Sequence, residues 1–178
     1  MKIAAIIATV VGVIWGVLLI VYSFYASYQY NNKIYSYWNL SVKASTLSLK
    51  SQYLDQFVGA LQDAKLSGND ALFFKTPDNS YAENFATLQS LQQRFHEVEA
   101  MDPTSFQYSQ SIQQITAQEQ DGAGDMLEVF RGVWYLNHYP LLWNWVLIIE
   151  AVICAYLACG GPIVMMVAFS RKPAIVSG

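Results

Sequence analysis

Apolar residues gather in two blocks, 3–25 and 141–169, and the chain between them mixes apolar and polar positions as a soluble protein does. Each block exceeds the roughly 20 residues that a helix needs to cross the hydrocarbon core of a bilayer. The first block is longer than the apolar stretch of a signal peptide and no small-residue cleavage site follows it, so we expect an uncleaved anchor. The pattern predicts two transmembrane helices.

The middle of the chain shows helical periodicity from its start. Leucines recur at intervals of seven: Leu40, Leu47, Leu54 and Leu61. This spacing predicts an amphipathic helix in a bundle more than a strict coiled coil. Asn31 and Asn32 are the residues that could break the helix between the membrane and these leucines. If the helix passes them unbroken, it runs from the first span to about Leu66.

Turn-forming residues divide the rest of the middle segment. The stretch 67–80 should end the first bundle helix, with Gly68 as its C-terminal cap. Ser80 and Glu83 have the spacing of a capping box at the start of a second helix. A third helix should begin near Asp102.

Both later helices should bury a stripe of apolar side chains: Tyr81, Phe85, Leu88, Phe95 and Val98 in the second, and Tyr108, Ile112, Ile115, Met126, Phe130 and Val133 in the third. Two glycines in the stretch 121–125 should kink or split the third helix, because each costs about 1 kcal/mol relative to alanine. The predicted class is therefore all-α: two transmembrane helices flank an extracytoplasmic helical bundle, and the first helix is long and continuous through the membrane.

Charge places the bundle outside the cytoplasm. Lys2 precedes the first block, Arg171 and Lys172 follow the second, and the segment between has seven basic and twelve acidic residues. Because basic residues favour the cytoplasmic side, we expect both termini in the cytoplasm. The expected domains are the first transmembrane helix with its aromatic belt (1–30), the extracytoplasmic bundle (31–139), the second transmembrane helix (140–170) and a short cytoplasmic tail (171–178).

Tyrosine and tryptophan crowd the polar ends of both apolar blocks and predict an interfacial belt: Tyr22, Tyr25, Tyr28, Tyr139, Trp143 and Trp145. These side chains favour the headgroup region because the ring is apolar and its polar tip stays wet. Antiparallel spans bring the two sets to one height, which supports the hairpin topology. Tyr35, Tyr37 and Trp38 lie beyond the belt and should pack near Phe130 and Trp134, or against another protein.

Three features inside the apolar blocks predict contacts within the membrane. Small residues form a helix-packing seam: Ala4, Ala8, Gly12 and Gly16. The blocks contain one charged residue, Glu150, which should contact a partner subunit, carry protons in an oligomer, or be a tolerated acid near the interface. Gly160, Gly161 and Pro162 should kink the second span, and such kinks usually shape packing.

No arrangement of residues in the sequence dictates a catalytic reaction. His96 and Glu99 lie one helical turn apart, as half of a metal site would, but the chain has two histidines and His138 lies far along the sequence. Hydrolase, phosphate-loop and zinc-type motifs are absent from the sequence. An acidic bundle without a basic patch argues against nucleic acid. We therefore expect no enzymatic activity, cofactor or metal.

The sequence favours a non-enzymatic accessory, assembly or scaffold subunit of a larger integral-membrane complex, in contact with lipid and with other subunits or a second copy through the seam. An alternative is an extracytoplasmic ligand-binding or sensing protein that signals through a separate partner, and a third is an oligomeric channel or transporter component that uses Glu150. The layout resembles that of bacterial sensory receptors with four-helix ligand domains, but only nine residues follow Phe169, too few for a signalling domain. We expect a prokaryotic plasma membrane location.

Overall fold

The computed structural model describes residues 2–71, 73–121, 123–143 and 146–156, and the regular structure within these ranges is helical. The predicted all-α class is therefore confirmed. The chain divides into two compact units. Unit 1 comprises the residues up to Tyr25 and those from Asn144 onward, and unit 2 comprises Ala26–Trp143.

Unit 1 contains most of α1 (Lys2–Tyr30) and the apolar helix Val146–Tyr156. Among the described residues, one continuous helix, Ile6–Lys43, is long and apolar enough to span a membrane by length and composition. Most of its apolar side chains up to Phe24 are exposed, as lipid-facing side chains would be. The rest of the predicted second span lies outside the described residues, and so do Trp145, Gly160, Gly161 and Pro162.

The first long helix ends earlier than its leucine spacing predicts. α1 passes into a π-helical turn, η1 (Asn31–Tyr35), and then into α2 (Ser36–Lys43). The backbone is extended at Ala44, and α3 (Leu47–Asp63) begins after this break and packs against α2. The predicted continuation to Leu66 is therefore wrong.

Thr46 explains the break. Its side chain accepts a hydrogen bond from the backbone N–H of Leu49 at 3.3 Å, which satisfies one of the free donors in the first turn of a new helix. The leucine stripe is thus divided between two helices, so that Leu54 and Leu61 are buried in the core while Leu40 is exposed.

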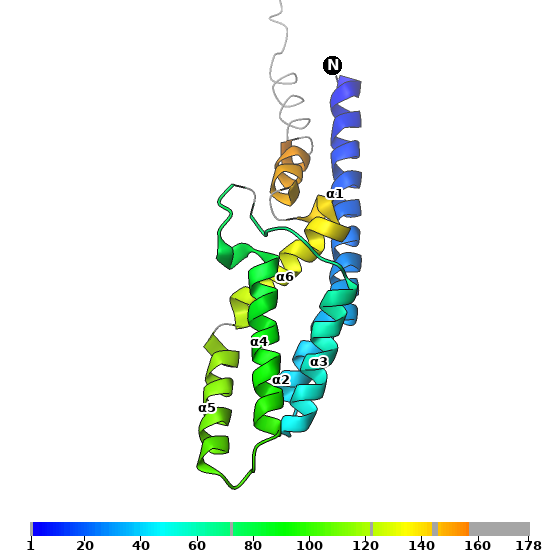
Figure 1. Ribbon diagram of the computed structural model, residues 1–178. Helices are drawn as coiled ribbons and strands as arrows, with labels where there is room; N and C mark the ends of the chain where they lie inside the picture. Colours follow the sequence, from blue (N-terminus) through cyan, green and yellow to red (C-terminus); the bar gives the residue numbers. More distant parts are fainter. Residues whose placement is uncertain (1, 72, 122, 144–145, 157–178) are drawn as a thin grey trace, which may run out of the picture. The chain divides into compact units, whose positions relative to one another are not determined.

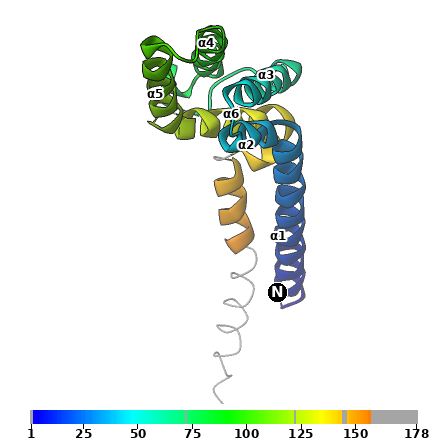
Figure 2. The same cartoon turned by 90° about the horizontal axis from the view of Figure 1, so that it is seen from below.

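The other helices of unit 2 follow in chain order: η2 (Pro77–Asn79), α4 (Tyr81–Glu99), α5 (Phe106–Asp121), α6 (Ala123–His138) and η3 (Pro140–Leu142). Consecutive helices from α2 to α5 pack as neighbours, and α6 packs against both α4 and α5 (Figures 1 and 2). α5 ends at Asp121 and α6 begins at Ala123, and position 122 lies outside the described residues, so the kink or split expected there stays a prediction.

Local hydrogen bonds correct two further expectations. Ser80 precedes α4, but its side chain makes no capping hydrogen bond, so the predicted capping box is wrong. The first bundle helix also ends earlier than the cap predicted at Gly68 would require. α3 ends at Asp63, and Lys65 adopts the left-handed conformation with φ of 49°. Gly68, with φ of 111°, therefore serves the loop and does not cap the helix.

A chain of aromatic rings joins the helices in the core of unit 2. The ring centroid of Phe57 lies 5.5 Å from Trp38 and 6.1 Å from Phe130, and that of Phe130 lies 5.7 Å from Tyr81. Tilted and edge-to-face rings at such separations attract each other beyond the burial of their area. The predicted apolar stripes of α4, α5 and α6 pack in this core. The rings therefore connect α2, α3, α6 and α4 in one cluster.

Candidate binding site

The most unusual backbone in unit 2 is the π-helical turn η1, whose sequence is "NNKIY". π-Helical turns are rare and are often found at functional sites. The buried residues Tyr30, Ile34 and Trp38 follow one another at intervals of four through this turn, so one face of the helix points into the bundle. The polar asparagines lie on the exposed side. This turn positions the side chains of the candidate site.

Tyr30 is buried, with an exposed fraction of 2%, yet its hydroxyl has no hydrogen-bond partner among the described residues. Its ring stacks on Tyr35 with 6.2 Å between centroids and lies 6.0 Å from Trp134. A phenol is normally buried with its O–H paired, because an unmade hydrogen bond costs about 1–3 kcal/mol. The Tyr30 hydroxyl is therefore a donor that lacks an acceptor.

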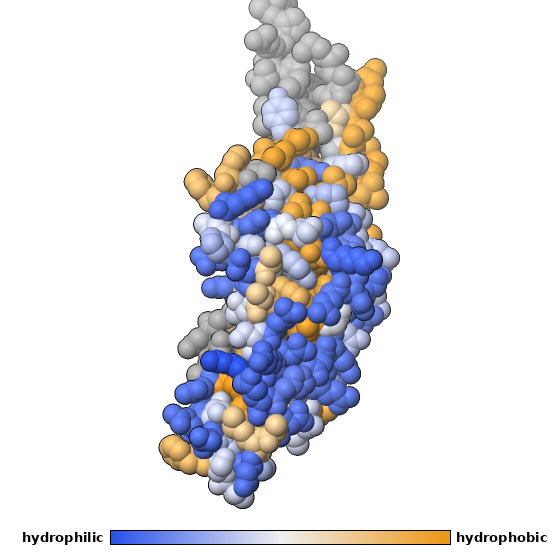
Figure 3. All heavy atoms as spheres, viewed as in Figure 1, coloured by the Kyte–Doolittle hydropathy of each residue, from blue (hydrophilic) through white to orange (hydrophobic). Residues whose placement is uncertain are grey.

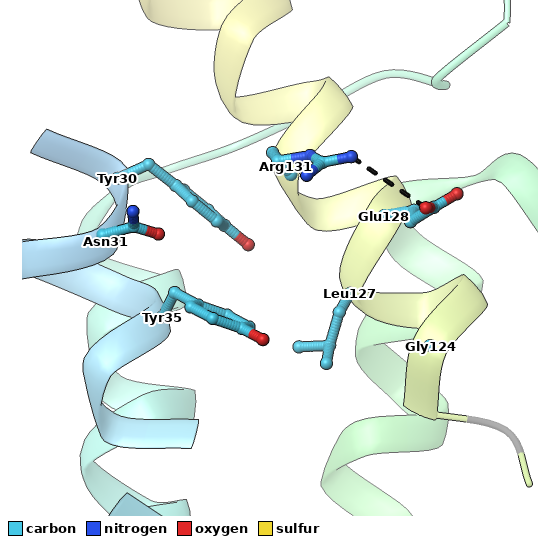
Figure 4. Close-up of a pocket in the computed structure, with 7 residues that line it drawn as sticks. All are labelled: Tyr30, Asn31, Tyr35, Gly124, Leu127, Glu128 and Arg131. Carbon is cyan, nitrogen blue, oxygen red and sulfur yellow. Dashed lines mark ion pairs between the residues drawn. The ribbon is translucent and has the colours of Figure 1, made fainter. Parts of the chain in front are cut away.

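Tyr30 lines a cavity of about 280 Å³ between η1 and α6. Figure 4 shows the phenol groups of Tyr30 and Tyr35 pointing across the cavity towards Leu127, with Arg131 and Glu128 at its edge. The Arg131 Nη2 atom lies 3.9 Å from Glu128 Oε1, and both side chains are exposed. The lining thus offers donors, one acceptor carboxylate and two aromatic faces, but no nucleophile. Its chemistry suits binding.

Trp134 on α6 is a second buried residue whose hydrogen-bond donor has no partner. It is 4% exposed, and its indole Nε1 has no hydrogen-bond partner in the described part of the chain. The ring stacks on His138 with 3.9 Å between centroids. Trp134 lines a second cavity of about 500 Å³, which also takes in Lys33 and Asp63. Two residues with a buried, unpaired donor therefore each line a cavity beside η1.

A second polar cluster joins α3 to α4, and of its members only His96 and Glu99 were singled out from the sequence. His96 Nε2 lies 2.9 Å from Asp55 Oδ1, and His96 Nδ1 lies 3.2 Å from Ser51 Oγ. The same Asp55 oxygen accepts a hydrogen bond from Gln92 Nε2 at 2.7 Å. These residues were not predicted as a group because they are about 40 positions apart in the sequence.

The cluster combines serine, histidine and aspartate but lacks an accessible nucleophile. Ser51 is 2% exposed, so no substrate can reach its hydroxyl, and catalysis needs an exposed nucleophile beside its base. Glu99 Oε2 lies 3.9 Å from His96 Nδ1. Among the described residues, no group of three or more histidine, cysteine, aspartate or glutamate side chains could hold a metal ion. We assign this cluster to helix packing.

The predicted intramembrane residues lie in unit 1. Glu150 is half-buried, and its Oε2 atom is inaccessible and has no hydrogen-bond partner among the described residues. In the small-residue seam Gly12 is buried, while Ala8 and Gly16 are half-buried. The side chain of Ala4 lies outside the described part. Glu150 therefore presents an unpaired polar atom within an apolar helix, where such groups are costly.

The predicted belt residues have different surroundings. Tyr25 and Tyr28 are exposed, and Tyr22 and Tyr139 are half-buried. Trp143 is buried, and its indole Nε1 donates a hydrogen bond to Asp70 Oδ1 at 3.0 Å. This indole is therefore bound to the bundle through Asp70.

Comparison of the chain with protein-family models, with curated proteins and with solved structures gave no match.

Proposed function

We propose that this protein is a non-enzymatic accessory subunit of a larger integral-membrane complex, with its helical bundle outside the cytoplasm. The observation that carries the proposal is the pair of buried donors beside η1, the Tyr30 hydroxyl and the Trp134 indole N–H. Buried polar groups are almost always paired, so two unpaired donors on residues that line cavities need an explanation. Acceptors on a partner would pair both donors if binding moves the side chains that now cover them.

The membrane segments supply the anchor in this proposal. The helix Ile6–Lys43 is long and apolar enough to be one span. The apolar composition of residues 140–170 predicts the second. Lys2, Arg171 and Lys172 favour a cytoplasmic location for both ends of the chain. Glu150 adds a second polar contact for a partner, because a donor from another transmembrane helix would pair its buried oxygen.

The polar chemistry of unit 2 supports binding over catalysis. Ser51 is inaccessible in the one serine, histidine and aspartate cluster that the described residues form. The cavity beside Tyr30 has donors and a carboxylate at its edge but lacks a nucleophile with an adjacent base. An accessory subunit needs surfaces that recognise a partner, and the two cavities beside η1 are such surfaces.

The test is the mass of the particle that the full chain forms after gentle detergent extraction from its native membrane, with identification of each component. We expect a complex of fixed stoichiometry that contains other membrane proteins. The variant Trp134→Phe keeps an aromatic ring, although a smaller one, and removes the N–H, so it should lower the yield of the partner. A chain that is always extracted as a monomer or as a homo-oligomer would overturn the proposal.

A second candidate function is recognition of a small zwitterion in the Tyr30 cavity. Its support is the opposite charges of Arg131 and Glu128 at the edge of a cavity of about 280 Å³ that Tyr30 also lines. An acid group would bind Arg131 and Tyr30, and an ammonium would bind Glu128. Screening amino acids for thermal stabilisation of the full chain tests this function. A stabilisation that Arg131→Gln abolishes would favour it over the accessory subunit.

A further inference from the structure

The connection between α3 and α4 exposes two adjacent aromatic side chains. Phe73 is 73% exposed and Phe74 is 86% exposed, although phenylalanine is among the residues most often buried. In Figure 3 apolar surface gathers at the end of unit 2 that has this connection, while the face over α3 and α4 is mostly hydrophilic. Adjacent exposed rings on a polar domain mark an interaction surface.

Hydrogen bonds fix the shape of this connection. Asn79 Nδ2 donates to the Phe74 carbonyl at 2.8 Å, and Asn79 Oδ1 accepts from the backbone N–H of Thr76 at 3.1 Å. The backbone N–H of Asp70 donates to the Asn79 carbonyl at 2.9 Å. The phenylalanines are therefore held outward on a braced loop tip.

The loop is attached to the end of the bundle from which the second apolar segment leaves. Trp143, the last residue of unit 2, donates its indole N–H to Asp70 at 3.0 Å, and Asn137 Nδ2 donates to the Ser67 carbonyl at 2.9 Å. Phe73 is three residues from Asp70, which an extended chain covers in at most about 11 Å. The rings thus lie close to the point where the chain enters that segment.

The charges around the rings fit a lipid surface. Lys75 follows the phenylalanines directly and is exposed, and no acidic residue stands between Asp70 and Asp78. A lysine beside apolar side chains can keep its stem along them while its ammonium reaches lipid phosphates. Phenylalanine side chains are suited to the apolar side of the same interface.

We propose that Phe73 and Phe74 insert into the outer interface of the bilayer and form a third membrane contact beside the two apolar segments. This inference rests on the proposed membrane anchoring. The contact would fix the orientation of the bundle above the membrane, because it holds the α3–α4 connection against the lipid while Trp143 holds the same connection to the bundle. The cavities beside η1 would then face a partner in a fixed direction.

The test uses the full chain in lipid nanodiscs of phosphatidylethanolamine and phosphatidylglycerol, with alanine at both native cysteines, Cys154 and Cys159. A cysteine introduced by Phe74→Cys is labelled with an environment-sensitive fluorophore. The matched control is Phe106→Cys, because Phe106 is 82% exposed but lies at the other end of α4, about 28 Å away at 1.5 Å per residue. The positive control is Val13→Cys in the exposed apolar part of α1.

We expect blue-shifted emission and quenching by nitroxide-labelled lipid at positions 13 and 74, and neither effect at position 106. Quenching at 13 without quenching at 74 would overturn this inference and leave the proposed anchor in place. Quenching at 74 and 106 alike would also overturn it, because the contact would not be specific to the loop. Absence of quenching at 13 would overturn the proposed anchoring and this inference with it.

Discussion

Replacing Tyr30 with phenylalanine tests the central observation of the candidate site. The substitution removes one oxygen and keeps the ring, so the stacking on Tyr35 is preserved. Most tyrosine to phenylalanine substitutions in a core are destabilising because they remove a hydrogen bond. For Tyr30 we expect the opposite sign, since the hydroxyl is buried at 2% exposure and makes no hydrogen bond in the described structure.

The expected magnitude follows from the burial of the hydroxyl. An unpaired buried donor costs about 1–3 kcal/mol, and Tyr30→Phe recovers part of this cost in the isolated chain. The matched control is Tyr81→Phe, because the Tyr81 hydroxyl donates to the Leu61 carbonyl at 3.2 Å. That variant should lower the free energy of unfolding by about 0.5–1.5 kcal/mol. The two variants therefore move the stability in opposite directions.

The assay is urea unfolding of the full chain in detergent, followed by tryptophan fluorescence and near-ultraviolet circular dichroism. In the native complex Tyr30→Phe, and not Tyr81→Phe, should be the harmful variant, because partner binding is then the quantity measured. Tyr30→Phe should weaken partner binding about two- to tenfold, because a hydrogen bond to a partner contributes about 0.5–1.5 kcal/mol, whereas Tyr81→Phe should leave binding unchanged. If Tyr30→Phe destabilises the isolated chain as much as Tyr81→Phe does, the hydroxyl is already paired and the reasoning is refuted.

Three further predictions concern other contacts. In Gly132→Ala the new methyl group would collide with the Asp70 carboxylate, which should lower the free energy of unfolding by about 1–3 kcal/mol. The control Gly59→Ala places its methyl group in open space and should be neutral or stabilising. Urea unfolding of both variants measures the difference. Burial raises the pKa of Asp70 above its ordinary value of 3.8, so its contribution to stability is fully present below that pH and is lost as pH rises through the native pKa. Asp70→Asn should therefore be more stable than the parent at neutral pH, with a difference that shrinks in acid, and a constant difference across the pH range would contradict the burial argument. Glu150→Gln should reduce the yield of the co-extracted complex while leaving the unfolding of the bundle unchanged, and an undiminished yield would remove Glu150 from the interface.

The sequence by itself determined the elements whose cause is local. The apolar block from residue 3 to 25 forms a helix, as its length and composition predict, and no distant residue is needed for that prediction. The apolar stripes of α4, α5 and α6 were predicted for the same reason, since 3.6-residue periodicity acts within a few turns of one helix. All-helical class followed from these local signals.

Where two signals competed, the sequence pattern was misleading. The leucine spacing continues through Ala44, so periodicity alone predicted one helix where Thr46 starts another. The capping-box spacing of Ser80 and Glu83 was likewise present without the hydrogen bond. A helix cap depends on the backbone angles of one residue, and the spacing of residue types along the sequence does not predict these angles.

Tertiary structure alone decided the polar contacts of the candidate site. Tyr30 and Trp134 are in contact although they are about 100 positions apart in the sequence. Two other contacts also join distant positions: Asp70 with Trp143, and Ser51 with His96. A hydrogen bond or its absence depends on the distance and angle between two groups, and these distances arise only when the helices pack. The sequence could supply the tyrosines and tryptophans, but only the packing of α6 against η1 and its neighbours leaves two of their donors buried without acceptors.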